Sequence, residues 1–138
     1  MKISTRGRYG LYFMMSLAEN YGFRKKSVRA IAEDREISDL YLEQIVAVLR
    51  KEKLVKSTRG AHGGYELANP PNKIYVGQIL RCLENNILAI EPDDKDRPPE
   101  RYLWSRLRDA LKDVVDHTTL EDLLNYDTQV NDDYMFYI

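Results

Sequence analysis

The residues of this chain that could do chemistry lie mainly between positions 38 and 67. The amide of Gln44 can pair with the edge of adenine, and the carboxylate of Glu43 can accept a hydrogen bond from cytosine. Arg59 is the type of cation best suited to a narrow minor groove, and Gly60 beside it allows the backbone to approach a groove closely. The chemistry that these residues predict is the recognition of base pairs in double-stranded DNA.

The elements that must position Glu43 and Gln44 are two short helices joined by a tight connection. Ser27 is a suitable N-cap for a helix that ends near Arg35, and Ser38 caps the next helix. An apolar stripe at helical period runs along this second helix, formed by Tyr41, Leu42, Ile45, Val46 and Leu49. Glu43 and Gln44 lie on or near the other side, as expected of the recognition helix in a helix-turn-helix. The alternative is a plain helical hairpin within a bundle.

The segment after this helix predicts a β-hairpin with a long basic loop. Residues 54–57 and 63–67 have strand character, and residues 58–62 between them contain Arg59, Gly60 and His62. His62 could add a phosphate contact, although an exposed histidine without a role is an equally good interpretation. A helix-turn-helix followed directly by such a hairpin is typical of a winged helix.

A long helix is expected over residues 100–116, followed by a short one over 119–124. An apolar stripe follows the long helix through Leu103, Leu107, Ala110, Leu111 and Val114. Because a winged-helix domain is already closed, this stripe needs another surface, and a two-fold partner is the simplest one. The stripe therefore predicts a homodimer, with its recognition helices roughly 34 Å apart or a multiple of it. The alternative is a helix that folds back on its own domain.

The sequence thus predicts a mainly α-helical fold with a small β-hairpin wing. We expect a winged helix-turn-helix domain over residues 1–84, a linker and dimerisation helices over 85–125, and a C-terminal tail over 126–138. The first helix should begin after Ser4 or Thr5. Its first turn holds Arg6 and Arg8, where cations and backbone amides could together meet a phosphate.

Composition and charge limit the class of protein. Residues 1–60 hold 13 Lys and Arg against 7 Asp and Glu, whereas residues 61–138 hold 8 against 15. A basic half is typical of a protein with a polyanion partner, and solvated surface charge is the alternative. We expect a cytoplasmic protein, because no apolar run could span a membrane and no signal-peptide pattern is present. No phosphate loop, metal-ligand cluster or nucleophile elbow appears, so we do not expect an enzyme.

Three stretches of the sequence carry a resemblance to a known family: MKISTRGRYGL, LYLEQIVAVLRK and STRGAHGGYEL. They resemble small bacterial winged-helix regulators that include the iron–sulfur sensor IscR and the nitric-oxide sensor NsrR. The resemblance covers essentially the whole chain and implies a dimeric repressor that acts at promoter operators. It also implies a DNA face made of Tyr9, Ser38, Tyr41, Glu43, Gln44, Arg59, Gly60 and His62. Leu40 stands where this family often has a polar residue, which leaves the operator sequence open.

The resemblance also bears on cofactors. Members of the family with an iron–sulfur cluster carry three cysteines in the loop before the long helix, whereas residues 91–99 of this chain contain none. We therefore expect no cofactor. The single cysteine, Cys82, is interpreted as a small buried apolar residue, with a redox role as the alternative.

The chain ends in large apolar side chains, Tyr134, Met135, Phe136, Tyr137 and Ile138. They could pack against a dimer core, or they could form a docking peptide whose terminal carboxylate is held by backbone amides. This ending resembles that of a cysteine-metabolism repressor of the family, whose partner is cysteine synthase. Serine acetyltransferase inserts a terminal isoleucine into the active site of that enzyme, and O-acetylserine competes for this site. The resemblance thus implies control of sulfur genes with cysteine synthase as the sensing partner.

Two other functions remain open at this stage. One is a redox or small-molecule sensor of the same fold that regulates other genes. The other is an interaction protein that acts mainly on an enzyme through its C-terminal tail.

Overall fold

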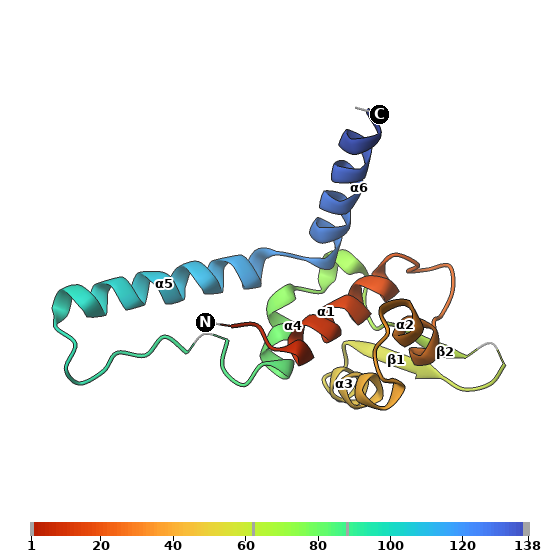
Figure 1. The fold of residues 1–138 in the computed structure, drawn as a ribbon, viewed down its shortest axis with the longest axis horizontal. Helices are drawn as coiled ribbons and strands as arrows, with labels where there is room; N and C mark the ends of the chain where they lie inside the picture. Colours follow the sequence, from red (N-terminus) through yellow and green to blue (C-terminus); the bar gives the residue numbers. More distant parts are fainter. Residues whose placement is uncertain (1, 62, 88, 137–138) are drawn as a thin grey trace.

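Helices and strands follow one another in the order of a winged helix with two further helices (Figure 1). The computed structural model describes residues 2–61, 63–87 and 89–136, and it describes side chains as far as residue 130 apart from those gaps. The helices are α1 (Thr5–Ala18), α2 (Val28–Arg35), α3 (Asp39–Lys51), α4 (Val76–Leu83), α5 (Pro98–His117) and α6 (Leu120–Phe136). The strands are β1 (Val55–Thr58) and β2 (Gly64–Leu67), and a short 3-10 helix, η1, spans Pro71–Lys73.

The helix-turn-helix forms because both of its helices are capped and its turn is tied down. The hydroxyl of Ser27 accepts a hydrogen bond from the amide of Ala30 at 3.1 Å, which satisfies one free donor at the start of α2. Between α2 and α3, Glu36 takes a left-handed backbone conformation with φ 55°, and this ends α2. The side chain of Ile37 is buried, and its amide donates to the carbonyl of Ala32 at 2.9 Å.

One apolar core joins α1, α2, α3 and α4. On α3 the predicted stripe faces the core, since Leu42, Ile45, Val46 and Leu49 are buried and Tyr41 is half-buried. Its main partner is α1, which contributes Phe13, Met14 and Leu17. Each fully buried side chain of this size contributes roughly 1.5–3 kcal/mol. This core fixes the angle at which α3 is presented to solvent.

The wing is an antiparallel hairpin whose register places Val55 opposite Leu67, with both side chains buried. A third segment joins the edge of the sheet at one bridge, because the amide of Lys26 donates to the carbonyl of Tyr65 at 3.0 Å and the carbonyl of Lys26 accepts from the amide of Tyr65 at 2.7 Å. The stem of the wing is therefore attached both to the core and to the loop that precedes α2. The mainly α fold with a β-hairpin wing is confirmed.

Helices α5 and α6 extend away from the winged-helix body in different directions (Figure 1). At about 1.5 Å per residue, the 20 residues of α5 span about 30 Å. It begins at Pro98, two residues earlier than predicted, because proline is well suited to the first helical position. Its C-terminal end is attached to α4 by an ion pair between Arg81 and Asp116.

The last helix differs from the prediction. A short helix over 119–124 followed by a tail was expected, but α6 continues through the predicted tail as far as Phe136. The helix starts with reciprocal hydrogen bonds between Thr119 and Asp122, at 2.9 and 3.0 Å. No glycine or proline interrupts residues 120–136, so nothing in the sequence ends the helix at residue 124.

Candidate nucleic-acid interface

The N-terminal half of α3 presents a polar face to solvent. Ser38, Glu43 and Gln44 are exposed, whereas the buried stripe holds the opposite face of the helix against the core. The hydroxyl oxygen of Ser38 accepts from the amide of Tyr41 at 3.3 Å, and its hydrogen remains able to donate. Leu40 is 71% exposed on the same turn and could make an apolar contact with a thymine methyl group.

Helix α1 supports this face through an aromatic pair. The ring of Tyr9 meets the ring of Tyr41 edge to face, with centroids 5.9 Å apart and an interplanar angle of 77°. Nearby, the guanidinium of Arg35 lies 4.1 Å from the ring centroid of Tyr12. The Tyr9–Tyr41 pair places both half-buried rings beside the N-terminal half of α3. Tyr9, Ser38, Tyr41, Glu43 and Gln44 thus lie on two adjoining elements.

The first turn of α1 differs from the expectation that its amides would meet a phosphate. The carboxylate of Glu84, at the end of α4, accepts from the amide of Ser4 at 2.9 Å and from its hydroxyl at 2.8 Å. The hydroxyl of Ser4 in turn accepts from the amide of Gly7 at 3.0 Å. A protein carboxylate therefore occupies the positive end of this helix. Arg6 and Arg8 remain exposed on this turn.

The wing tip needs its glycines. Gly60 has φ 105°, a left-handed conformation that other residues rarely adopt, and its carbonyl accepts from the amide of Gly63 at 3.0 Å. A Cβ atom on Gly63 would lie 2.1 Å from the carbonyl oxygen of Thr58. Arg59 is exposed at this tip, and His62 lies outside the described residues. The wing is thus a narrow loop that carries a cation and presents little side-chain bulk.

Cys82 is half-buried against the core of the winged-helix domain. Burial raises the pKa of its thiol, which also donates to the carbonyl of Ile79 at 3.1 Å. A raised pKa favours the protonated, less reactive form of a thiol. This agrees with the interpretation of Cys82 as a packing residue that is only partly enclosed.

The predicted dimerisation stripe lies on the exposed part of α5. Leu103, Leu107 and Val114 are 49%, 40% and 60% exposed, Ala110 is exposed, and Leu111 is half-buried. Val115 is the one fully buried side chain of this helix. Leu107 also borders a pocket lined by Lys2, Ile3 and Ile90, so the stripe is covered only in part by the described chain.

The residues predicted to dock on a partner are at the end of the chain. Tyr134, Met135 and Phe136 belong to the last turn of α6, but their side chains are outside the described part of the structure. Tyr137 and Ile138 lie outside the described residues altogether.

Sequence reasoning missed two features of this interface. No local pattern links Glu84 to Ser4, because the two residues come together only through the packing of α4 on α1. The second feature is the run Arg24-Lys25-Lys26, which lies beside the wing in the folded chain. Its three consecutive cations are visible in the sequence, and they could have been assigned to the interface.

Comparisons with known proteins agree with this geometry. The model of the Rrf2 family, described as iron-dependent transcriptional regulator, matches residues 3–126. The HTH-type transcriptional regulator CymR of Bacillus subtilis is 49% identical over 138 residues, which is 100% of both chains. The solved structure of CymR, the global cysteine regulator of B. subtilis, matches with a TM-score of 0.86, covering 91% of this chain and 98% of that chain. The oxidized form of Staphylococcus aureus CymR matches at 49% identity with a TM-score of 0.78, covering 89% of this chain and 95% of that chain.

The donor set of this chain does not fit the iron cofactor suggested by the family description. An iron–sulfur cluster is held by several thiolates, and Cys82 is the single cysteine in the sequence. Its thiol is bonded to a backbone carbonyl within its own helix. Before α5, Asp93 and Asp96 instead make hydrogen bonds within the loop, and the carboxylate of Asp96 accepts from the indole of Trp104 at 3.0 Å.

Proposed function

Because the chain belongs to the Rrf2 family of transcriptional regulators, we propose that it binds operator DNA as a dimer and represses transcription. The observation that carries this proposal is the exposed polar face of α3, supported by α1 and followed by a glycine wing with Arg59 at its tip. This arrangement suits a helix in the major groove and a loop in the adjacent minor groove.

Within this proposal, Gln44 and Glu43 read base edges. Both side chains are exposed near the N-terminal end of α3, the part of a recognition helix that reaches the groove floor. Gln44 pairs with adenine, and Glu43 accepts from cytosine while repelling phosphates in any other register. Tyr9, Ser38, Tyr41 and the wing residues Arg59, Gly60 and His62 contact the backbone or the minor groove and set the orientation of the helix.

The dimer forms through the exposed stripe on α5. A single α5 leaves Leu103, Leu107 and Val114 substantially in contact with water, which favours their burial against a second copy. An isologous contact about a two-fold axis also presents two recognition helices to a pseudo-palindromic operator.

The genes under control are those of sulfur and cysteine metabolism. This step rests on the 49% identity to the regulator CymR over the full length of both chains, together with the description of that protein as the global cysteine regulator of B. subtilis.

Cysteine synthase is the proposed sensing partner, and the apolar end of the chain is the docking segment. Because α6 continues to Phe136, a helix carries this segment away from the DNA-binding face (Figure 1). Docking places the terminal carboxylate among backbone amides and the side chain of Ile138 in an apolar pocket of the enzyme. O-acetylserine competes for the same pocket and thereby changes the amount of complex.

One experiment tests both the regulator and its partner. Duplexes selected from a randomised pool are used to measure DNA affinity by anisotropy, with and without cysteine synthase, for the intact chain and for a chain lacking Ile138. We expect the enzyme to change the affinity of the intact chain alone. If the two chains respond alike, the docking proposal fails. If no duplex is selected, the assignment as a DNA-binding repressor fails.

A further inference from the structure

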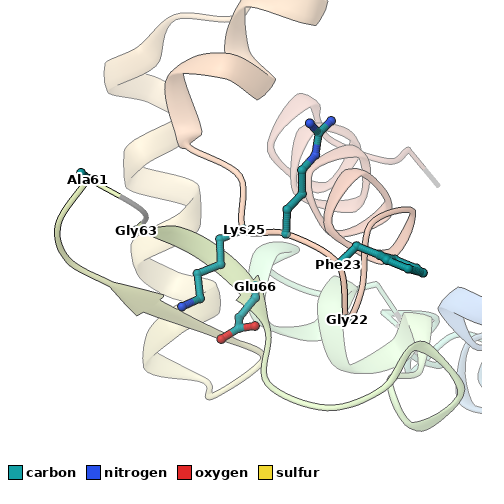
Figure 2. Close-up of a pocket in the computed structure, with 7 residues that line it drawn as sticks. Gly22, Phe23, Lys25, Ala61, Gly63 and Glu66 are labelled. Atoms are coloured by element: carbon teal, nitrogen blue, oxygen red, sulfur yellow. The ribbon is translucent and has the colours of Figure 1, made fainter.

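A groove of about 520 Å³ lies between the tip of the wing and the loop that connects α1 and α2 (Figure 2). The loop lines it with Phe23, Arg24 and Lys25, and the wing lines it with Ala61, Gly63 and Glu66. A second groove of about 480 Å³ shares Arg24, Lys25 and Gly63 and extends along α2 past Ser27 and Ala30. The loop cations therefore border both hollows beside the wing tip.

The position of this loop is fixed by the sheet. Lys26 exchanges two backbone hydrogen bonds with Tyr65 of β2, at 2.7 and 3.0 Å, so the cations before it are attached to the edge of the wing. The side chain of Lys25 is directed toward the strand that carries Glu66 (Figure 2). Gly64 allows this close approach, because a Cβ atom there would lie 2.8 Å from the carbonyl oxygen of Lys26.

The loop cations share their grooves with carboxylates, because Glu66 lines the first groove and Glu33 and Asp34 line the second. Among the described residues, the nearby Arg29 pairs with Glu33 at 3.3 Å and Lys56 pairs with Glu66 at 3.7 Å. No such ion pair is formed within the described chain by the run Arg24-Lys25-Lys26. Three adjacent cations repel one another, and an anionic partner would remove that repulsion.

We propose that the loop over residues 24–26 binds the phosphate backbone of the DNA strand that borders the minor groove entered by the wing. This inference rests on the proposed function. The minor groove is about 6 Å wide, so a wing inserted into it has a phosphate strand on each side. A loop attached to one edge of the wing meets one of those strands. The contact holds the wing in place and carries no sequence information.

The exposed ring of Phe23 separates this proposal from a protein-docking surface. Phe23 is 90% exposed beside the cations. An acidic protein segment would use the aromatic ring together with the cations, whereas a phosphate strand uses the cations alone. The variant Phe23→Ser therefore has different consequences for the two kinds of partner.

The test is the salt dependence of DNA affinity, measured by anisotropy with the full chain on a duplex selected from a randomised pool and on a scrambled duplex. The variant Arg24→Gln/Lys25→Gln is compared with Lys73→Gln/Lys95→Gln, which makes the same charge change at two exposed positions outside α3 and the wing. The slope of log Kobs against log salt is negative, and each lost phosphate contact reduces its magnitude by about 0.9. The loop variant should therefore show a slope whose magnitude is smaller by about 2 per protomer on both duplexes. The matched control and Phe23→Ser should keep the wild-type slope.

Three outcomes would overturn the inference. The first is an unchanged slope for the loop variant while the wild-type chain binds DNA, which would leave the proposed function intact and indicate a different partner for the loop. The second is an equal loss of salt slope in the matched control, which would mean that the effect comes from the net charge of the protein alone. The third is an equal loss in Phe23→Ser. Failure of the wild-type chain to bind any duplex would instead overturn the proposed function.

Discussion

Removing apolar side chains from the exposed stripe of α5 should dissociate the protein into folded monomers. The variant is Leu103→Ser/Leu107→Ser, at positions that are 49% and 40% exposed in the single chain. Full burial of a leucine is worth roughly 1.5–3 kcal/mol, so covering the remaining half contributes about 1 kcal/mol for each side chain. With two such side chains on each of two protomers, the variant loses about 4 kcal/mol, or about a thousandfold in dimer dissociation constant.

The assay is sedimentation equilibrium over a range of protein concentrations, with circular dichroism to verify that the helices remain. The matched control is Tyr102→Ser, which removes a large side chain that is 65% exposed on α5 but lies outside the stripe. We expect the control to dimerise like the wild-type chain. An unchanged dissociation constant in the leucine variant, or an equal loss in the control, would refute the assignment of this stripe to the dimer interface.

Three further predictions concern the wing and the attachment of α5. Arg59→Ala should weaken binding to all duplexes alike and lower the salt slope, as measured by anisotropy, and a loss confined to one sequence would argue against a groove contact. Gly63→Ala places a Cβ atom 2.1 Å from the carbonyl oxygen of Thr58, so DNA affinity should fall while the thermal unfolding midpoint changes little. The hydrogen bond from Arg81 lowers the pKa of Asp116 below its usual 3.8. Stability from this pair is therefore present above that pH and lost as the pH falls through the lower folded-state pKa. The free energy of unfolding, measured as the pH is lowered, should show this loss in the wild-type chain but not in Asp116→Asn. Identical pH profiles for the two chains would refute the contribution of this ion pair.

The parts of the fold that follow from short-range pattern could be predicted from the sequence. Ser27 and Ser38 indicate the starts of α2 and α3, because a capping hydroxyl accepts a hydrogen bond from an amide only three residues later. The apolar period of α3 identifies its buried face, and the glycines around residue 60 identify the wing. These signals need no knowledge of the distant parts of the chain.

The features that were missed depend on contacts between segments distant in the sequence. Glu84 reaches Ser4 only because α4 packs on α1, so the sequence indicated Ser4 as a candidate cap of α1 but not the carboxylate that binds it. The polar residues after Leu124 suggested a tail, yet their types are all compatible with a helix, and α6 continues through them. The edge-to-face pair of Tyr9 and Tyr41 likewise depends on the packing of α1 against α3, and no local spacing in the sequence indicates it.

The most direct test of the central claim is the base preference of Gln44→Ala on the duplex that the wild-type chain selects. Anisotropy is measured for that duplex and for a set in which each base pair is changed in turn. The proposed position of Gln44 on the exposed face of α3 predicts that discrimination falls at one base pair in each half-site, by about 1–3 kcal/mol, while preferences elsewhere are kept. Unchanged discrimination at every position would contradict the assignment of α3 as the recognition helix.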